Sequence, residues 1–399
     1  MKRHWMAVAC AMSLGLAAHS AQAQGSKVTI GLLTDMSGVI SDLGGPGSLE
    51  AVRMAVADFG GKVLDKPIEV LFADHQNKAD IAAARAREWI DRQNLDLLLG
   101  GTNSAAALAM NQIAAEKNRV FIVDASSDRF TNEDCKPYTI HYPQDTTALA
   151  RGTATALVKE GGKSWFFLTA DYAFGHSLEK TTADVVRAKG GTVIGGVRHP
   201  IATTDFSSYM LQAQASKAQV LGLANAGADT VNAIKSARDF GLAEKTKLAA
   251  LLVFITEIHS LGLQATQGLY FTETWYWNLN DKTREFGRRF HAKTGKMPTT
   301  IQTANYSAVT NWLKAVQAVG STDAAKVVDY MKRTPIDDVF AKGRILANGS
   351  FIKDTFLMQV KKPSESKEPW DYYHVVARIP GEQAFRSEAE STCPLLKKG

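Results

Sequence analysis

The sequence has few of the residues that build metal centres and catalytic motifs. Its 399 residues include three cysteines and nine histidines, and these are not clustered at metal-ligand spacing. The zinc-peptidase pattern HExxH and the nucleophile pattern GxSxG are both absent. His75, His141 and His176 have no nucleophile arranged beside them in the sequence. We therefore expect no metal, no cofactor and no enzymatic activity, with a secreted α/β enzyme as the alternative from a different class.

The sequence also has no apolar run near its start that is long enough to cross a membrane. The stretch from Met6 to Ala18 has about 13 residues, whereas a spanning helix needs about 20. It follows Lys2 and Arg3 and precedes Ala21-Gln22-Ala23, which is the pattern of a secretory signal peptide. We predict a cleaved signal peptide over residues 1–23 and a mature start at Gln24. A transmembrane helix, or a lipoprotein anchored through Cys10, fits this pattern less well.

Basic runs are missing as well, so the formal net charge of +6 does not form a nucleic-acid binding stripe. Removal of residues 1–23 would lower that charge to +4 and would leave Cys135 and Cys393 as the only cysteines. Two cysteines in an exported protein pair more often than not. Sequence alone leaves two interpretations open, a disulfide or two buried thiols.

Strand-like and helix-like segments alternate along most of the remaining chain, which is typical of parallel sheets covered by helices. The first series of predicted segments comprises 28–33, 47–59, 68–72, 79–93, 95–99, 103–116 and 120–123. The second series comprises 146–159, 165–169, 175–189, 192–196, 206–216, 218–223, 229–240, 248–253 and 269–272. Helices over 282–293, 301–318 and 323–332 follow, then strands over 355–360 and 372–376. We predict two doubly wound α/β units with a ligand cleft at the carboxyl ends of their strands.

Small polar residues follow several of these predicted strands. Thr102-Asn103-Ser104 opens a helix, and Ala125-Ser126-Ser127 follows the strand over 120–123. Helix amino-termini carry unpaired N–H donors, so these residues could bind an anionic carboxylate. The alternative is that Ser104 and Ser126 only cap a helix or shape a turn. In the second unit, Asp171 to Gly175 and Asn225 to Gly227 occupy equivalent positions, where Tyr172 and Phe174 could face an apolar ligand or simply pack in the loop.

Several of these segments, taken in order, resemble a known family. They are Ile30 to Gly38, Gly100 to Ser104, Asp171 to Gly175 and Gln267 to Leu269. The order and spacing of these segments resemble those of periplasmic solute-binding proteins of the leucine/isoleucine/valine-binding family. Members of this family are the receptors of ATP-driven importers. The resemblance extends from about Val28 to Lys397.

The resemblance implies a fold, partners and a location. The expected fold is α/β, with two doubly wound Rossmann-like lobes joined by a three-crossover hinge, the type I periplasmic binding protein fold. Lobe 1 would comprise residues 24–142 plus 273–347, and lobe 2 residues 143–272 plus 348–399. A monomer in the Gram-negative periplasm would close on its ligand and deliver it to an inner-membrane permease and its ATPase. A subgroup resemblance through residues 272–281 and the tail implies that Cys135 pairs with Cys393.

The resemblance also implies a set of ligand-binding residues. Ser104 and Ser126 would bind the ligand carboxylate, with backbone help from Thr102 and Ala125. Leu43 stands where the family places an apolar wall residue, and Tyr172, Phe174 and Asn225 to Gly227 fall in the loops that close over the ligand. Phe254 and Trp275 would add apolar surface, although Trp275 and Tyr276 could instead pack in the core or at the hinge.

One departure from the family bears on the ligand. Amino-acid-binding members use an acidic residue after the strand that corresponds to 248–253, where this chain has Leu251-Leu252-Val253-Phe254. A buried ammonium without a carboxylate costs several kcal/mol, so an amino acid should bind poorly unless Asp229 or Glu257 substitutes. We therefore expect a small hydrophobic or aromatic carboxylate. A branched-chain amino acid, an amide or a urea is the alternative ligand.

Overall fold

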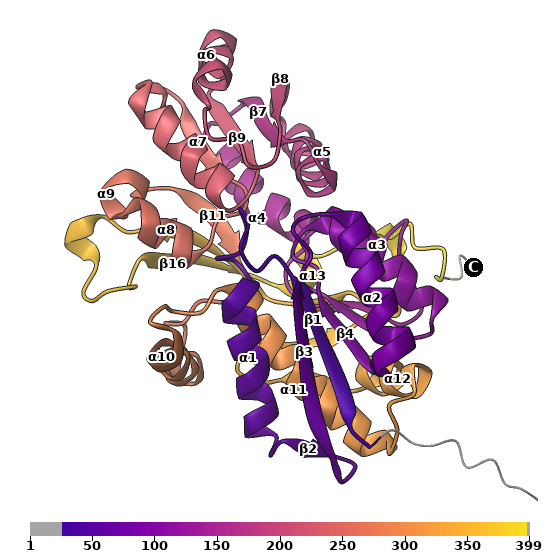
Figure 1. Cartoon of the computed structure of the whole chain (residues 1–399). Helices are drawn as coiled ribbons and strands as arrows, with labels where there is room; N and C mark the ends of the chain where they lie inside the picture. The colour runs from indigo at the N-terminus through magenta and orange to yellow at the C-terminus, as the bar shows by residue number, and fades with distance from the viewer. Residues whose placement is uncertain (1–25, 397–399) are drawn as a thin grey trace, which may run out of the picture.

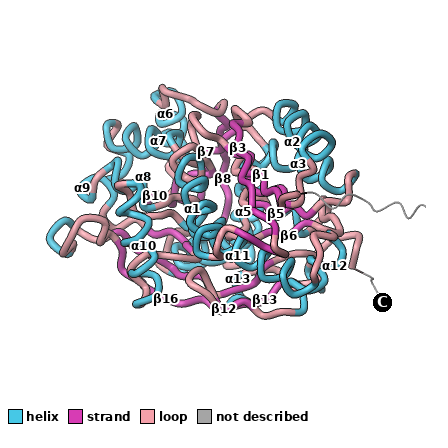
Figure 2. Tube along the Cα trace, turned by 60° about the horizontal axis from the view of Figure 1, so that its bottom comes forward, coloured by secondary structure: helices cyan, strands magenta, loops and turns pink. Residues whose placement is uncertain are grey.

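The computed structural model describes residues 26–396 and consists of two parallel sheets, each covered by helices (Figures 1 and 2). The predicted signal peptide and its cleavage site lie outside the described residues. Within residues 26–396, no helix has both the length and the apolar character needed to cross a bilayer.

The first sheet has the order β2-β3-β1-β4-β5-β6 and is parallel except for the β2–β3 pair. Its strands are β1 (Val28–Thr34), β2 (Lys62–Val63), β3 (Lys66–Asp74), β4 (Leu97–Gly100), β5 (Val120–Val123) and β6 (Thr139–His141). Every residue of β1 is buried, because helices cover both faces of this sheet.

Two pairs of helices cover the first sheet. Their bounds are α1 (Gly45–Asp58), α2 (Ala79–Gln93), α3 (Ser104–Glu116) and α11 (Thr300–Val319). α2 and α3 pack on one face, where Leu33, Leu98 and Phe121 are buried. α1 and α11 pack on the other face, where Ile30, Leu32 and Leu99 belong to the main core. We use lobe 1 for this sheet together with α1–α3, α10 (Asp281–Thr294), α11 and α12 (Ala324–Arg333).

The second sheet has the order β16-β15-β11-β10-β9-β7-β8, in which β15 is antiparallel to both of its neighbours, β11 and β16, and the other pairs are parallel. Its strands are β7 (Ser164–Ala170), β8 (Thr192–His199), β9 (Val220–Ala224), β10 (Lys247–Ala250), β11 (Tyr270–Glu273), β15 (Thr355–Val360) and β16 (Tyr373–Ile379). The helices are α4 (Thr146–Lys159), α5 (Ala173–Ala188), α6 (Ser207–Ser216), α7 (Ala228–Asp239), α8 (Ile255–Leu261) and α9 (Leu263–Thr266). We use lobe 2 for this sheet with α4–α9.

The chain passes between the sheets more than once, so each lobe is built from separate segments. After β6 it enters lobe 2, and after β11 it returns to lobe 1 through α10–α12. A small sheet, β12 (Ile336–Asp337), β13 (Lys342–Ile345) and β14 (Phe351–Lys353), adjoins β6 through a bridge between His141 and Ser350. The chain then re-enters lobe 2 at β15.

The segment after β16 and α13 (Gly381–Ala384) runs back to lobe 1. A disulfide joins Cys135 to Cys393, 258 residues apart, so the predicted pairing is confirmed. Nearby, the Ser391 hydroxyl donates to the Thr131 carbonyl at 2.7 Å. The tail therefore connects the two lobes a further time, near the start of α4, where the Arg151 guanidinium donates to the Phe385 carbonyl at 2.7 Å.

The α/β prediction is confirmed, and every predicted strand and helix is present with bounds that differ by a few residues. The prediction was wrong about the end of the strand over 248–253, because β10 stops at Ala250. Residues 251–254 leave the sheet, and two of them, Leu252 and Phe254, line the cleft described below. Strands β2, β6 and β12–β14 were not predicted, since two to four residues carry too little periodicity.

Candidate functional site

A small cavity lies between the two lobes, at the carboxyl ends of their parallel strands. The packed lobes leave it a volume of only about 10 Å³, close to the room that one water molecule needs, so a ligand requires the lobes to open. It is lined by Ile40, Leu43, Thr102, Asp124, Ser126, Tyr172, Phe174, Ala226, Leu252, Phe254 and Ile301. In lobe 1 the strand order reverses between β1 and β4, and in lobe 2 between β7 and β9. Ligands of doubly wound sheets bind at such switch points, so this cavity is the candidate site.

The lobe 1 wall begins with a loop that a buried carboxylate shapes. Asp35 follows β1, and its oxygens accept hydrogen bonds from the backbone N–H groups of Gly38 at 2.7 Å and Ile40 at 3.0 Å. Asn77 donates to the same carboxylate at 2.8 Å. These bonds fix the loop so that the buried side chains of Ile40 and Leu43 line the cavity.

The polar part of the lobe 1 wall consists of Thr102, Asp124 and Ser126. Asp124 follows β5 directly and is 1% exposed. Its carboxylate accepts hydrogen bonds from Thr102 Oγ1 at 3.3 Å and from Asn305 Nδ2 at 2.9 Å. Burial raises the pKa of the Asp124 carboxyl to about 6, against the lowering effect of those two hydrogen bonds. Asp124 is the only charged side chain among the lining residues.

Lobe 2 supplies most of the aromatic surface. Tyr172 and Phe174 lie at the start of α5 with their ring centroids 5.9 Å apart. Burial raises the pKa of the Tyr172 phenol, and the charge of Asp229 raises it further. Phe254 is fully buried at the N-cap of α8, where its backbone N–H donates to Glu257 at 2.7 Å. Burial raises the pKa of the Glu257 carboxyl to about 8.

Six of the predicted site residues meet in this cavity: Leu43, Thr102, Ser126, Tyr172, Phe174 and Phe254. Ser104, Ala125, Asn225, Gly227 and Trp275 are not among the residues that line it. Ser104 is the first residue of α3, and its buried hydroxyl has no hydrogen-bond partner. The Ala125 carbonyl is 2.6 Å from His141 Nε2, and the Asn225 side chain contacts His199 and Thr230.

Trp275 and Gly227 have other positions. The Trp275 indole donates to the Val339 carbonyl at 3.0 Å and packs edge-on against Phe286 in the core. Of the two alternatives for Trp275, the structure therefore favours packing over ligand stacking. Gly227 lies where the lobes touch: the next residue, Ala228, donates its N–H to the Val39 carbonyl at 3.0 Å.

Sequence reasoning missed Ile40, Asp124 and Ile301. Asp124 had a usable signal, because it immediately precedes Ala125-Ser126 at the end of a predicted strand. Ile301 had none, since α11 reaches the cavity only through the return of the chain to lobe 1.

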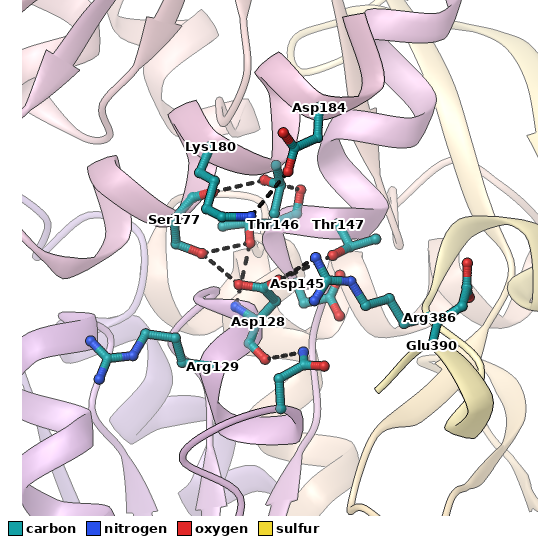
Figure 3. Close-up of polar contacts among 12 residues, drawn as sticks. Asp128, Arg129, Asp145, Thr146, Thr147, Ser177, Lys180, Asp184, Arg386 and Glu390 are labelled. Carbon is teal, nitrogen blue, oxygen red and sulfur yellow. Dashed lines mark hydrogen bonds and ion pairs between the residues drawn. The ribbon is translucent and has the colours of Figure 1, made fainter. Parts of the chain in front are cut away.

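A second contact between the lobes lies outside the cavity, around Asp128. Its carboxylate accepts a hydrogen bond from Ser177 of α5 at 2.7 Å and pairs with Arg386 of the tail at 3.0 Å, as Figure 3 illustrates. Thr147 of α4 also donates to Asp128, at 3.3 Å. These contacts hold the lobes together on the tail side of the cleft.

A wider surface groove lies between α4, α5 and β16, away from the strand ends. Its rim mixes Arg151, Lys159 and Lys189 with Glu160 and Asp184. No loop that follows a parallel strand lines it. The smaller interlobe cavity is therefore the better candidate for the functional site.

Comparison with known proteins agrees with this geometry. The family model described as periplasmic binding protein matches residues 27–367. The crystal structure of a periplasmic binding protein from Burkholderia mallei is 63% identical, with a TM-score of 0.92, covering 93% of this chain and 100% of that chain. A branched chain amino acid ABC transporter periplasmic ligand-binding protein from Burkholderia xenovorans LB400 is 40% identical, with a TM-score of 0.82, covering 92% and 100% respectively.

A more distant structure shares the fold. The solute-binding protein of an ABC transporter from R. palustris, in complex with benzoate, has a TM-score of 0.82 and 19% identity, covering 92% of this chain and 99% of that chain. The match to the family model and the 63% identical structure together show the family. The chain belongs to the periplasmic binding protein family, as a type I solute-binding protein of ATP-driven importers and not an enzyme.

Proposed function

We propose that this protein binds a small hydrophobic or aromatic carboxylate between its lobes and delivers it to an inner-membrane permease and its ATPase. The observation that carries the proposal is the composition of the cavity wall. Seven lining side chains are apolar, namely Ile40, Leu43, Phe174, Ala226, Leu252, Phe254 and Ile301. Such a wall favours a ligand with an apolar body. The R. palustris protein with the same fold that binds benzoate is consistent with this ligand class.

The carboxylate of the ligand would bind on lobe 1. α3 begins at Ser104, two residues after Thr102, and both Thr102 and Ser126 line the cavity. The side-chain oxygen of Asn103 already accepts from the N–H groups of Ala105 at 2.9 Å and Ala106 at 3.1 Å, so it is the helix dipole, not these two donors, that favours a negative charge at this position. This assignment retains Ser104 and Ser126 as carboxylate binders, with backbone donors from Thr102 and Ala125.

Ligand capture would occur by lobe closure at the chain crossings. Lys353 supports this role for the hinge, since its buried Nζ donates to the carbonyls of Tyr142 at 2.9 Å and Pro143 at 2.8 Å. Thr274 of the second crossing donates to Gln144 of the first at 3.0 Å. We keep the boundaries near 142 and 272, and strand pairing supports a third boundary near Asp354 in place of 347.

A branched-chain amino acid is the second candidate ligand, and one observation favours it. Asp124 places a carboxylate in the cavity, so the acid that sequence reasoning found missing after residue 253 has a substitute on lobe 1. The 40% identical Burkholderia xenovorans protein is described as a branched chain amino acid binder. The two candidates share an apolar body and a carboxylate and differ in the ammonium.

Calorimetric titration of residues 24–399 with benzoate, cinnamate, leucine and valine tests the proposal. We expect the aromatic acids to bind with an affinity that Phe254→Leu weakens. Tight binding of leucine or valine with no binding of either aromatic acid would refute the primary ligand class. Mass spectrometry of the protein secreted to the periplasm tests export separately, and a start at Gln24 is the expected result.

A further inference from the structure

Asp124 is a buried carboxyl group beside the cavity that has no positively charged partner among the described residues. The carboxyl is buried, and within residues 26–396 it forms no ion pair with Lys, Arg or His. Its only side-chain partners, Thr102 and Asn305, are uncharged. Burying an ionised carboxylate without a counter-charge costs several kcal/mol. The ionised form of Asp124 would therefore be stabilised by a further hydrogen-bond donor.

The Asp124 carboxylate can also accept more hydrogen bonds than it receives from these two side chains. An ionised carboxylate has about four lone-pair sites, and two of them are occupied here, one by Thr102 and one by Asn305. The Asn305 amide is itself fixed by Ser48 of α1, to which it donates at 2.9 Å. Asn305 of α11, positioned by Ser48 of α1, therefore holds the Asp124 carboxylate, and Asp124 is among the residues that line the cavity.

No other lining residue duplicates this role. The remaining polar side chains of the cavity, those of Thr102, Ser126 and Tyr172, are hydroxyls that can donate as well as accept. An ionised carboxylate only accepts, so Asp124 selects for a donor on the ligand and against a second negative charge. The ligand carboxylate must then lie away from Asp124, toward Ser126 and the amino-terminus of α3.

We propose that Asp124 is a specificity-determining residue that accepts a hydrogen bond from an N–H or O–H group on the apolar acid in the cavity. This inference rests on the proposed function and narrows its ligand class. The ligand carries two polar ends on an apolar body: a carboxylate, and an ammonium or hydroxyl that Asp124 recognises. Unsubstituted acids such as benzoate fit the apolar wall but leave Asp124 unpaired.

Two matched ligand pairs separate the possible donors. Leucine and 4-methylpentanoate differ by the ammonium, and 4-hydroxybenzoate and benzoate differ by the hydroxyl. Calorimetric titration at pH 7.5 should give a preference of about tenfold or more for the donor-bearing member of at least one pair. The preferred pair identifies whether the donor is an ammonium or a hydroxyl.

Two substitutions assign the preference to Asp124. D124A removes the acceptor and should abolish either preference. D124N removes the charge but keeps one acceptor oxygen, so it should abolish a preference for leucine and reduce one for 4-hydroxybenzoate less. S126A is the matched control, because loss of a carboxylate partner should weaken both members of a pair equally. Binding of the donor-free acid by each variant verifies that the site is folded.

The pH dependence of the unmodified protein provides a test that needs no variant. The groups that face Asp124 are Thr102, Asn305 and, across the cavity, Tyr172, and none of them changes charge between pH 5 and 7.5. The preference should therefore rise over this range as Asp124 ionises. A preference that is flat with pH, or that survives D124A, would overturn the inference while leaving the proposed function intact. Failure of all four acids to bind would overturn both.

Discussion

Substitution of Gly227 by alanine tests whether the contact between Val39 and Ala228 belongs to the ligand-bound state. Gly227 has φ +64° and ψ −139°, a conformation that residues with a Cβ rarely adopt. A Cβ at this position would lie 2.3 Å from the Val39 carbonyl oxygen of the opposite lobe. The Val39 oxygen is a backbone atom, and the position of a Cβ is fixed by the backbone of its own residue. Neither atom can rotate away, so the lobes would have to separate to relieve the overlap.

The magnitude follows from the contacts that separation breaks. The Ala228 N–H to Val39 hydrogen bond, 3.0 Å long, is worth about 0.5–1.5 kcal/mol. Loss of this hydrogen bond, together with any remaining overlap between the new Cβ and the Val39 oxygen, should make lobe closure less favourable by about 1–3 kcal/mol. Ligand affinity should then weaken by about 5-fold to 150-fold. Calorimetric titration measures the affinity, and small-angle X-ray scattering should show a larger radius of gyration with ligand than the unmodified protein has.

Gly262 provides the matched control. It also lies in lobe 2 with a positive φ, +77°, but nothing lies within 4 Å of the Cβ that G262A would add. G262A should therefore lower thermal stability through backbone strain and leave affinity unchanged. Unchanged affinity in a folded G227A protein, or an equal loss in G262A, would show that the Val39 contact does not control closure.

Three further predictions concern the disulfide, the cavity wall and a buried acid. Because Cys135–Cys393 closes a loop of 258 residues, C393S should lower the free energy of unfolding by up to about 5 kcal/mol, and an unchanged urea midpoint would contradict this. F254L should weaken aromatic-acid binding, whereas F290L, at a buried phenyl outside the cavity, should lower stability alone; equal affinity losses would count against Phe254 as a ligand contact. The pKa of Glu257, raised by burial to about 8, makes the folded state bind its proton more tightly than the unfolded state does, so stability falls from about pH 4.5 to 8. E257Q should then raise the melting temperature more at pH 8 than at pH 5, and an identical gain at both would refute the assignment.

Much of the fold could be predicted because its elements carry strong local signals. Helices such as α2 (Ala79–Gln93) and strands such as β5 (Val120–Val123) have the predicted bounds, since apolar periodicity and buried β-branched runs extend over their whole length. Short strands such as β6 exist only because neighbouring backbone pairs with them. The end of β10 at Ala250 likewise depends on tertiary contacts, because the apolar run continues to Phe254 while the sheet does not.

The lining of the candidate site could be predicted only in part, for a related reason. Residues that directly follow strands, such as Thr102, Ser126 and Tyr172, could be placed by the rule that strand ends meet at one edge. Ile301 could not, because a helix about 175 residues beyond Ser126 brings it there through the second chain crossing. Asp124 directly precedes Ala125, a predicted site residue. That it has no positively charged partner can be seen only from its neighbours in the folded structure.

The sequence by itself determined the α/β class, the two doubly wound units, the pairing of Cys135 with Cys393 through family resemblance, and the sheet edge at which we propose that a ligand binds. These properties depend on local periodicity and on the order of elements, which a chain carries without folding. Only the tertiary structure decided which side chains face the cavity. It placed Trp275 in the core, Gly227 against Val39, and a buried carboxylate, Asp124, among apolar walls. The physical reason is that burial, counter-charge and lobe contact are properties of neighbours in space, and those neighbours come from distant parts of the chain.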